Sequence, residues 1–143
     1  MKEARRVVIT GIGTINAIGN NIDEYFSNLE KGVSGCAEIT HFDATNFKSR
    51  IACEVKNYDC SNYFDRKEVR KYDRFSQFAM IAATEAFEDA NFDLETLNKE
   101  RAGVVWSSGI GGIQALYNEV MGWAEGDSIP RFSPFFVDRK SVV

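Results

Sequence analysis

The chain has 143 residues, of which 44% are hydrophobic and 27% are charged, and its net charge is −4. This balance is typical of a soluble globular domain long enough to bury a core. The chain is less polar than disordered proteins are, so the composition excludes that class. The negative charge disfavours general nucleic-acid binding, and no apolar run is long enough to span a membrane.

The cysteine pattern indicates a reducing compartment. Cys36, Cys53 and Cys60 are odd in number and lack a Cys-x-x-Cys spacing, and His41 is the only histidine. A zinc site needs a closer cluster with more ligands. We therefore expect a cytoplasmic protein with no metal and no cofactor.

The first predicted element is a strand over residues 6–10, which are nearly all β-branched. It runs into Gly11-Ile12-Gly13. A dinucleotide fingerprint would require a third glycine at the position of Asn16, and the lysine of a phosphate-binding loop is also missing. The pattern therefore disfavours nucleotide binding.

A helix is predicted to follow, with Asn21 as its N-cap, Glu24 at its third position and Gly32 just after its end. Its expected buried stripe consists of Ile22, Tyr25, Phe26 and Leu29.

Residues 33–48 are predicted to form a loop that holds Cys36 and His41 without pairing them. Apolar and polar residues then alternate over residues 51–56, which predicts a strand. The alternation places Cys53 on the apolar face, where burial would make it an inert thiol.

Residues 65–74 hold five basic side chains in an otherwise acidic protein. On a helix, Arg66, Arg70 and Arg74 would recur every four residues, and Lys67 and Lys71 would do the same beside them. Like charges at this spacing cost about 0.2–0.5 kcal/mol per pair. Two interpretations remain open: a solvated face, or a basic ridge for an acidic macromolecular partner.

A long helix is predicted over residues 74–90, capped by Asp73 and closed by Asn91. It is apolar on most sides, so we expect it to be buried between layers. Its many alanines would allow a neighbouring helix or sheet to approach closely.

The next predicted unit is a buried strand over residues 103–107, followed by a glycine loop and a helix from Ile113 to about Trp123. Such a junction is a common ligand site in α/β proteins, because bare backbone N–H groups can approach a ligand. Ile110 is the one large apolar side chain in the loop. It would either line a pocket or fill the core beneath the loop.

The last predicted feature is an aromatic run over residues 132–137, interrupted by Pro134. Such a run should face a partner or a pocket.

Six motifs, taken in order, resemble those of β-ketoacyl-[acyl carrier protein] synthases, most closely the type II elongating enzymes of bacterial fatty-acid synthesis. They are RVVITGIG (residues 6–13), IGN (18–20), HFD (41–43), RKEVRKYD (66–73), SGIGG (108–112) and SPFF (133–136). The resemblance extends to Val137. It implies the α/β thiolase-like fold, here as an incomplete N-terminal portion with a mixed sheet and a buried helix layer.

The resemblance also implies roles for particular residues. Ile110 matches a position that lines the acyl-chain pocket, and Phe136 matches one that shapes this pocket at the interface of a homodimer. The loop glycines Gly109, Gly111 and Gly112 would frame the pocket. The basic positions that receive the acidic acyl carrier protein are matched by Lys67, Arg70 and Lys71.

In the family, a cysteine accepts an acyl group from a thioester, and malonyl-acyl carrier protein then condenses with it as carbon dioxide is lost. That cysteine, two histidines and a lysine follow the SPFF motif at a distance, and neither His41 nor any cysteine here matches a catalytic position. We expect residues 1–137 to be the N-terminal portion of a synthase domain and residues 138–143 to be a tail that departs from the family pattern. The chain would then be a truncated, inactive fragment.

One alternative is a non-catalytic partner subunit of the same fold, comparable to the chain-length factors. Another is a fragment without a stable fold.

Overall fold

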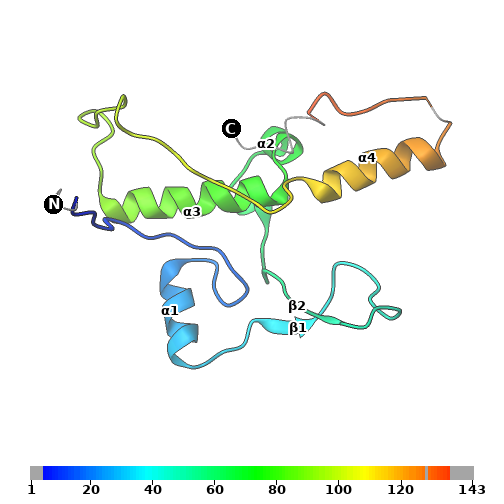
Figure 1. Ribbon diagram of the computed structural model, residues 1–143, viewed down its shortest axis with the longest axis horizontal. Coiled ribbons are helices and arrows are strands. Elements are labelled where there is room, and N and C mark those ends of the chain that lie inside the picture. Colours follow the sequence, from blue (N-terminus) through cyan, green and yellow to red (C-terminus); the bar gives the residue numbers. More distant parts are fainter. Residues whose placement is uncertain (1–4, 128, 136–143) are drawn as a thin grey trace. The chain divides into compact units, whose positions relative to one another are not determined.

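The computed structural model describes residues 5–127 and 129–135 (Figure 1). The chain divides into two compact units. The first consists of the described residues up to Tyr58 together with Ile81–Leu97, and the second of Asp59–Met80 and the described residues from Asn98 onward. The long helix α3 (Arg74–Ala90) passes from the second unit into the first.

The first unit contains helix α1 (Ile22–Glu30) and the strands β1 (Cys36–Glu38) and β2 (Ile51–Cys53), besides the C-terminal part of α3. The two strands are antiparallel, and Cys36 lies opposite Cys53. The second unit contains a 3-10 turn, η1 (Cys60–Asn62), and the helices α2 (Arg66–Lys71) and α4 (Ile113–Glu125), besides the start of α3.

Helix α1 begins and ends as predicted. The Asn21 side chain accepts a hydrogen bond of 2.8 Å from the backbone N–H of Glu24. At the other end, Gly32 has a φ of 64°, and the backbone N–H of Val33 donates back to the Asn28 carbonyl. This left-handed glycine allows the chain to leave the helix at once.

The extended segment before α1 lies against α3 (Figure 1). A Cβ atom on Gly11 or Gly13 would clash with backbone atoms of α3, at Ala86 and Ala90 or at Ala82 and Ala86. The expected close approach at the alanines is observed, but the neighbour is an extended segment and not the predicted helix or sheet.

Acidic side chains of α3 bind the backbone of the same segment. The Glu85 carboxylate accepts hydrogen bonds of 2.7 Å from the N–H groups of Thr14 and Ile22. The Asp89 carboxylate accepts one of 2.8 Å from the N–H of Ile12. The extended backbone thus finds its acceptors on a helix and not on a neighbouring strand.

The predicted strands at residues 6–10 and 103–107 are wrong for this structure, because neither segment lies in a sheet. Within the described residues, the sheet consists of β1 and β2 alone, so the predicted mixed sheet is absent. Val8 is 62% exposed and Val105 is 98% exposed. A strand needs a hydrogen-bonding neighbour, and β-propensity does not provide one.

The predicted burial of the helices is also too high. Along α3, Ala79 and Ile81 are buried, but Met80 and Phe87 are exposed, so α3 is not enclosed between layers. The predicted stripe of α1 contains no buried residue.

Two predictions fall on residues that the structure does not describe. Phe136 and the tail at 138–143 lie outside the described residues. Among the helices that are described, none is long and apolar enough to cross a lipid bilayer.

Substituting Gly13 with alanine should destabilise the first unit by about 1–3 kcal/mol, the usual cost of overpacking. The new methyl group would meet the Ala82 carbonyl and the Ala86 N–H, which cannot move without distorting α3. Urea unfolding followed by circular dichroism measures the change. Gly103→Ala is the matched control, because a Cβ there has no atom within 4 Å. Equal stability of the two variants would contradict the close approach.

Candidate functional site

The glycine loop leads directly into α4, as the sequence predicts. Gly112 is buried, has a φ of 66° and serves as the N-cap of α4 without a side-chain hydrogen bond. A residue with a side chain would be strained in this left-handed conformation. The start of α4 thus has no side-chain cap, and the role of this loop as a ligand site stays a prediction.

Ile110 lies exposed in this loop, at 68% of its maximal surface. The interpretation that it fills the core beneath the loop is therefore wrong in this structure. Gly109 has open space around it, whereas Gly111 is half-buried. The side chain of Ile110 is available to line an apolar pocket formed with other residues.

The basic ridge is built on α2, which the sequence stabilises at both ends. Asp65 and Glu68 form a reciprocal capping box at its start. Arg70 and Lys71 lie in its last turn, where positive charge favours the helix dipole. Lys67, Arg70 and Lys71 are all exposed. We define the basic ridge by these three residues.

One part of the predicted ridge is wrong. Tyr72 has an extended backbone and ends α2, so Arg74 belongs to α3 and does not continue the row of Arg66 and Arg70. The Nζ atom of Lys71 lies 5.3 Å from the centroid of the Tyr72 ring, a cation–π contact that orients this lysine.

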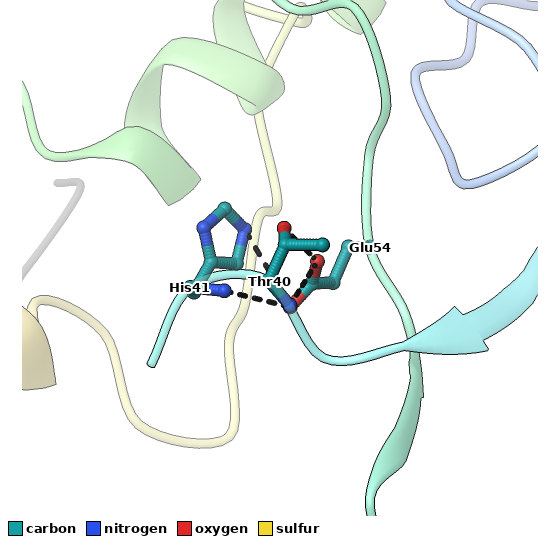
Figure 2. Close-up of polar contacts among 3 residues, drawn as sticks. All are labelled: Thr40, His41 and Glu54. Atoms are coloured by element: carbon teal, nitrogen blue, oxygen red, sulfur yellow. Dashed lines mark hydrogen bonds and ion pairs between the residues drawn. The ribbon is translucent and has the colours of Figure 1, made fainter. Parts of the chain in front are cut away.

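A polar cluster that the sequence did not reveal joins Thr40, His41 and Glu54 (Figure 2). The Glu54 carboxylate accepts a hydrogen bond of 2.7 Å from the Thr40 hydroxyl, and it also accepts from the backbone N–H groups of Thr40 and His41. His41 Nε2 lies 4.0 Å from Glu54 Oε1. Residues 33–48 thus include strand β1, which corrects the predicted loop, and His41 contacts Glu54.

Hydrogen bonding sets the charge state of this cluster. The Thr40 hydroxyl, followed by the backbone donors, lowers the pKa of Glu54. The carboxylate is therefore ionised at neutral pH and ties the residue that follows β2 to the chain just after β1. It has no bound proton to donate, so its geometry suits a structural clamp better than a general acid.

None of the three cysteines has the surroundings of a nucleophile. Cys36 and Cys53 are exposed, which corrects the prediction that Cys53 is buried. Partial desolvation, together with a hydrogen bond that the Cys36 thiol makes to the Cys53 side chain, raises the pKa of Cys36. Cys60 is half-buried and follows the acidic Asp59. A reactive thiol requires a lowered pKa, whereas the net shift at Cys36 is upward despite the nearby charge of Lys56.

In the part of the chain that the structure describes, no group of three or more His, Cys, Asp or Glu side chains is arranged so that it could hold a metal ion.

The aromatic run lies beside α4. The backbone N–H of Ser133 donates to the Glu119 carboxylate at 3.1 Å. Glu119, Trp123 and Phe132 line an open groove beside α4. The expectation that this run faces a pocket is confirmed for Phe132. The contact of Phe136 stays a prediction.

Comparison with known proteins relates these features to one family. Residues 4–138 match the model of the "Beta-ketoacyl synthase, N-terminal domain". The chain is 41% identical over 138 residues to the 3-oxoacyl-[acyl-carrier-protein] synthase 2 of Staphylococcus aureus strain COL. That alignment covers 96% of this chain and 33% of the relative, so the chain spans about a third of its curated relatives.

Solved structures give the same result for the fold. The ishigamide ketosynthase/chain length factor matches with a TM-score of 0.71 and 30% identity, covering 96% of this chain and 34% of that one. A ketosynthase in complex with a type II polyketide acyl-carrier protein matches with a TM-score of 0.70 and 25% identity, covering 92% and 34%. The structure thus corresponds to the N-terminal region of ketosynthases, whose fold is thiolase-like.

The Glu54 cluster should weaken in acid. Because its folded-state pKa is lowered, Glu54 stabilises the fold fully above the ordinary glutamate pKa of about 4.3, and this contribution is lost as the pH falls through the lower folded value. Amide hydrogen exchange should show the N–H groups of Thr40 and His41 losing protection below about pH 4. In Glu54→Gln, which cannot titrate, protection should not change with pH. The same acid-induced loss in the variant would disprove the clamp.

Proposed function

Because the chain belongs to the β-ketoacyl synthase family, we propose that it forms the N-terminal part of a condensing enzyme that elongates fatty acyl chains. The reaction is the decarboxylative Claisen condensation of an acyl thioester with malonyl-acyl carrier protein. The observation that carries this proposal is the 41% identity to a 3-oxoacyl-[acyl-carrier-protein] synthase 2 across nearly the whole chain. The complete enzyme would act as a cytoplasmic homodimer without a cofactor.

The role of these residues in that enzyme is binding and not covalent catalysis. The reaction needs a thiolate to accept the acyl group, and the surroundings of Cys36, Cys53 and Cys60 do not activate a thiol. Alone, the 143-residue chain is therefore inactive in condensation. Residues 1–137 supply the synthase portion in this proposal, and residues 138–143 are a tail outside the family pattern.

The basic ridge receives the acyl carrier protein. Lys67, Arg70 and Lys71 are exposed on one short helix in a protein whose net charge is −4. A local positive patch on a negative protein attracts an acidic partner while the rest of the surface repels it. A related solved structure contains a ketosynthase together with its acyl-carrier protein, which supports a protein partner of this class.

The glycine loop forms part of the acyl pocket. Ile110 presents an exposed apolar side chain from a loop whose other residues are glycine and serine, and Gly109, Gly111 and Gly112 would frame the pocket beside it. An acyl chain is the ligand class that such a wall suits, since it offers only apolar contacts. By the family resemblance of its motif, Phe136 would complete this wall from the neighbouring subunit.

A second candidate function is a non-catalytic partner subunit. It is favoured by the lack of an activated thiol in the described residues, and one solved structure similar to this chain pairs a ketosynthase with a chain length factor. Such a subunit would use the same ridge and loop to shape a pocket for an active ketosynthase.

A chimeric enzyme tests the main proposal and separates it from the second. Residues 4–138 would replace the matching third of the Staphylococcus aureus synthase, which supplies the catalytic residues. We expect the chimera to acylate its cysteine and to release the elongated product, measured by mass spectrometry of the carrier protein. A folded, acylated chimera that makes no elongated product would contradict the proposal. If it regained activity only with an added ketosynthase, the partner-subunit candidate would replace it.

Reversing charge on the ridge should weaken docking. In the chimera, Arg70→Glu with Lys71→Glu should raise the KM for acyl-carrier protein about tenfold at low salt, since each exposed ion pair contributes up to about 1 kcal/mol. Acyl-coenzyme A, which lacks the carrier protein, should react nearly as before, and added salt should shrink the difference.

The matched control changes the same number of charges elsewhere. Lys99→Glu with Arg101→Glu alters two exposed basic residues outside α2. This control should leave the KM for acyl-carrier protein within about twofold, as expected of general surface charge. An equal effect from both double variants would rule out a specific ridge.

A further inference from the structure

The strands β1 and β2 bring two cysteines face to face. Cys36 lies directly opposite Cys53 in the antiparallel register, and a hydrogen bond joins their side chains. Neither thiol is needed for the proposed function. The sequence pattern did not predict that Cys36 and Cys53 face each other.

The register identifies the kind of pair. The backbone N–H of Ile39 donates to the carbonyl of Arg50 at 3.0 Å, so these two residues form a hydrogen-bonded pair. The two kinds of pair alternate along an antiparallel ladder, which makes Cys36 and Cys53 a non-hydrogen-bonded pair. The Cα atoms of such pairs are about 4.5 Å apart, within the range of about 4.4–6.8 Å that a disulfide spans.

Both sulfur atoms belong to exposed residues, whereas Cys60 is half-buried in the other unit. A small oxidant can therefore reach Cys36 and Cys53 without unfolding the protein.

We propose that Cys36 and Cys53 form a cross-strand dithiol site that a small disulfide, such as oxidised glutathione, converts to an intramolecular disulfide. One protein thiolate attacks the glutathione disulfide, forms a mixed disulfide and releases one glutathione. The second protein thiol loses its proton, attacks the protein sulfur and releases the other glutathione. Two protein thiols are oxidised and one glutathione disulfide is reduced to two thiols.

Closing this bond would covalently join two strands of three residues each. The Glu54 cluster ties the residue after β2 to Thr40 and His41, just after β1. Together the two contacts would keep β1 and β2 paired in an oxidising environment, and excess reduced glutathione would release the covalent one.

Disulfide mapping of the full chain tests the site, and Cys60 provides an internal reference. In a random chain, the seven-residue separation of Cys53 and Cys60 favours that pair over Cys36 and Cys53, seventeen residues apart, by about fourfold. The folded structure predicts the reverse preference. The chain would be treated with oxidised glutathione in native buffer and in 6 M guanidinium chloride, the remaining thiols alkylated, and the peptides identified by mass spectrometry.

We expect the Cys36–Cys53 bond to dominate in native buffer and the Cys53–Cys60 bond in guanidinium chloride. Cys60→Ser should retain the native product, and Cys36→Ser should lose it. The same distribution in both solvents, or mixed glutathione disulfides alone, would overturn the proposal. A native preference for Cys53–Cys60 would also overturn it.

Discussion

The first unit depends on one constraint: an extended backbone with no strand beside it must find hydrogen-bond acceptors elsewhere. Glu85 and Asp89 of α3 supply them for Thr14 and Ile12, and Glu85 also accepts from the N–H of Ile22. This is possible only because glycine in the segment and alanine on the helix let the two backbones come close. Since Ile22 is the first residue of α1, the same carboxylate that holds the segment also fixes the start of the next helix.

Features decided by local chemistry could be predicted from the sequence. Asn21 caps α1 and Gly32 ends it, Asp65 caps α2, and Asn91 closes α3 in a left-handed conformation, because each needs only residues a few positions away. The strands at 6–10 and 103–107 could not be settled in this way. Their β-branched residues describe a tendency, but the pairing partner is a non-local property that a sequence pattern does not contain.

The candidate site shows the same division. The ridge on α2 and the glycine loop before α4 follow from charge and glycine spacing, and both lie where the pattern placed them. The cluster of Glu54 with Thr40 and His41, and the facing of Cys36 and Cys53, depend on the register of β1, which was expected to be loop. Without knowing that register, neither the Glu54 cluster nor the facing of the two cysteines can be derived from the sequence. The contacts of Glu85 and Asp89 had only a weak signal in the sequence, namely charged residues on a helix that is otherwise rich in alanine.

The central claim is that this chain contributes surfaces for a carrier protein and an acyl chain, while the nucleophile of the condensing enzyme is none of its own cysteines. Intact-mass measurement after incubation with a long-chain acyl-carrier protein tests it most directly. We expect the 143-residue chain to stay unmodified, while the chimera that carries a catalytic cysteine gains one acyl group. A stoichiometric acyl adduct on Cys36, Cys53 or Cys60 of the chain alone would contradict the claim.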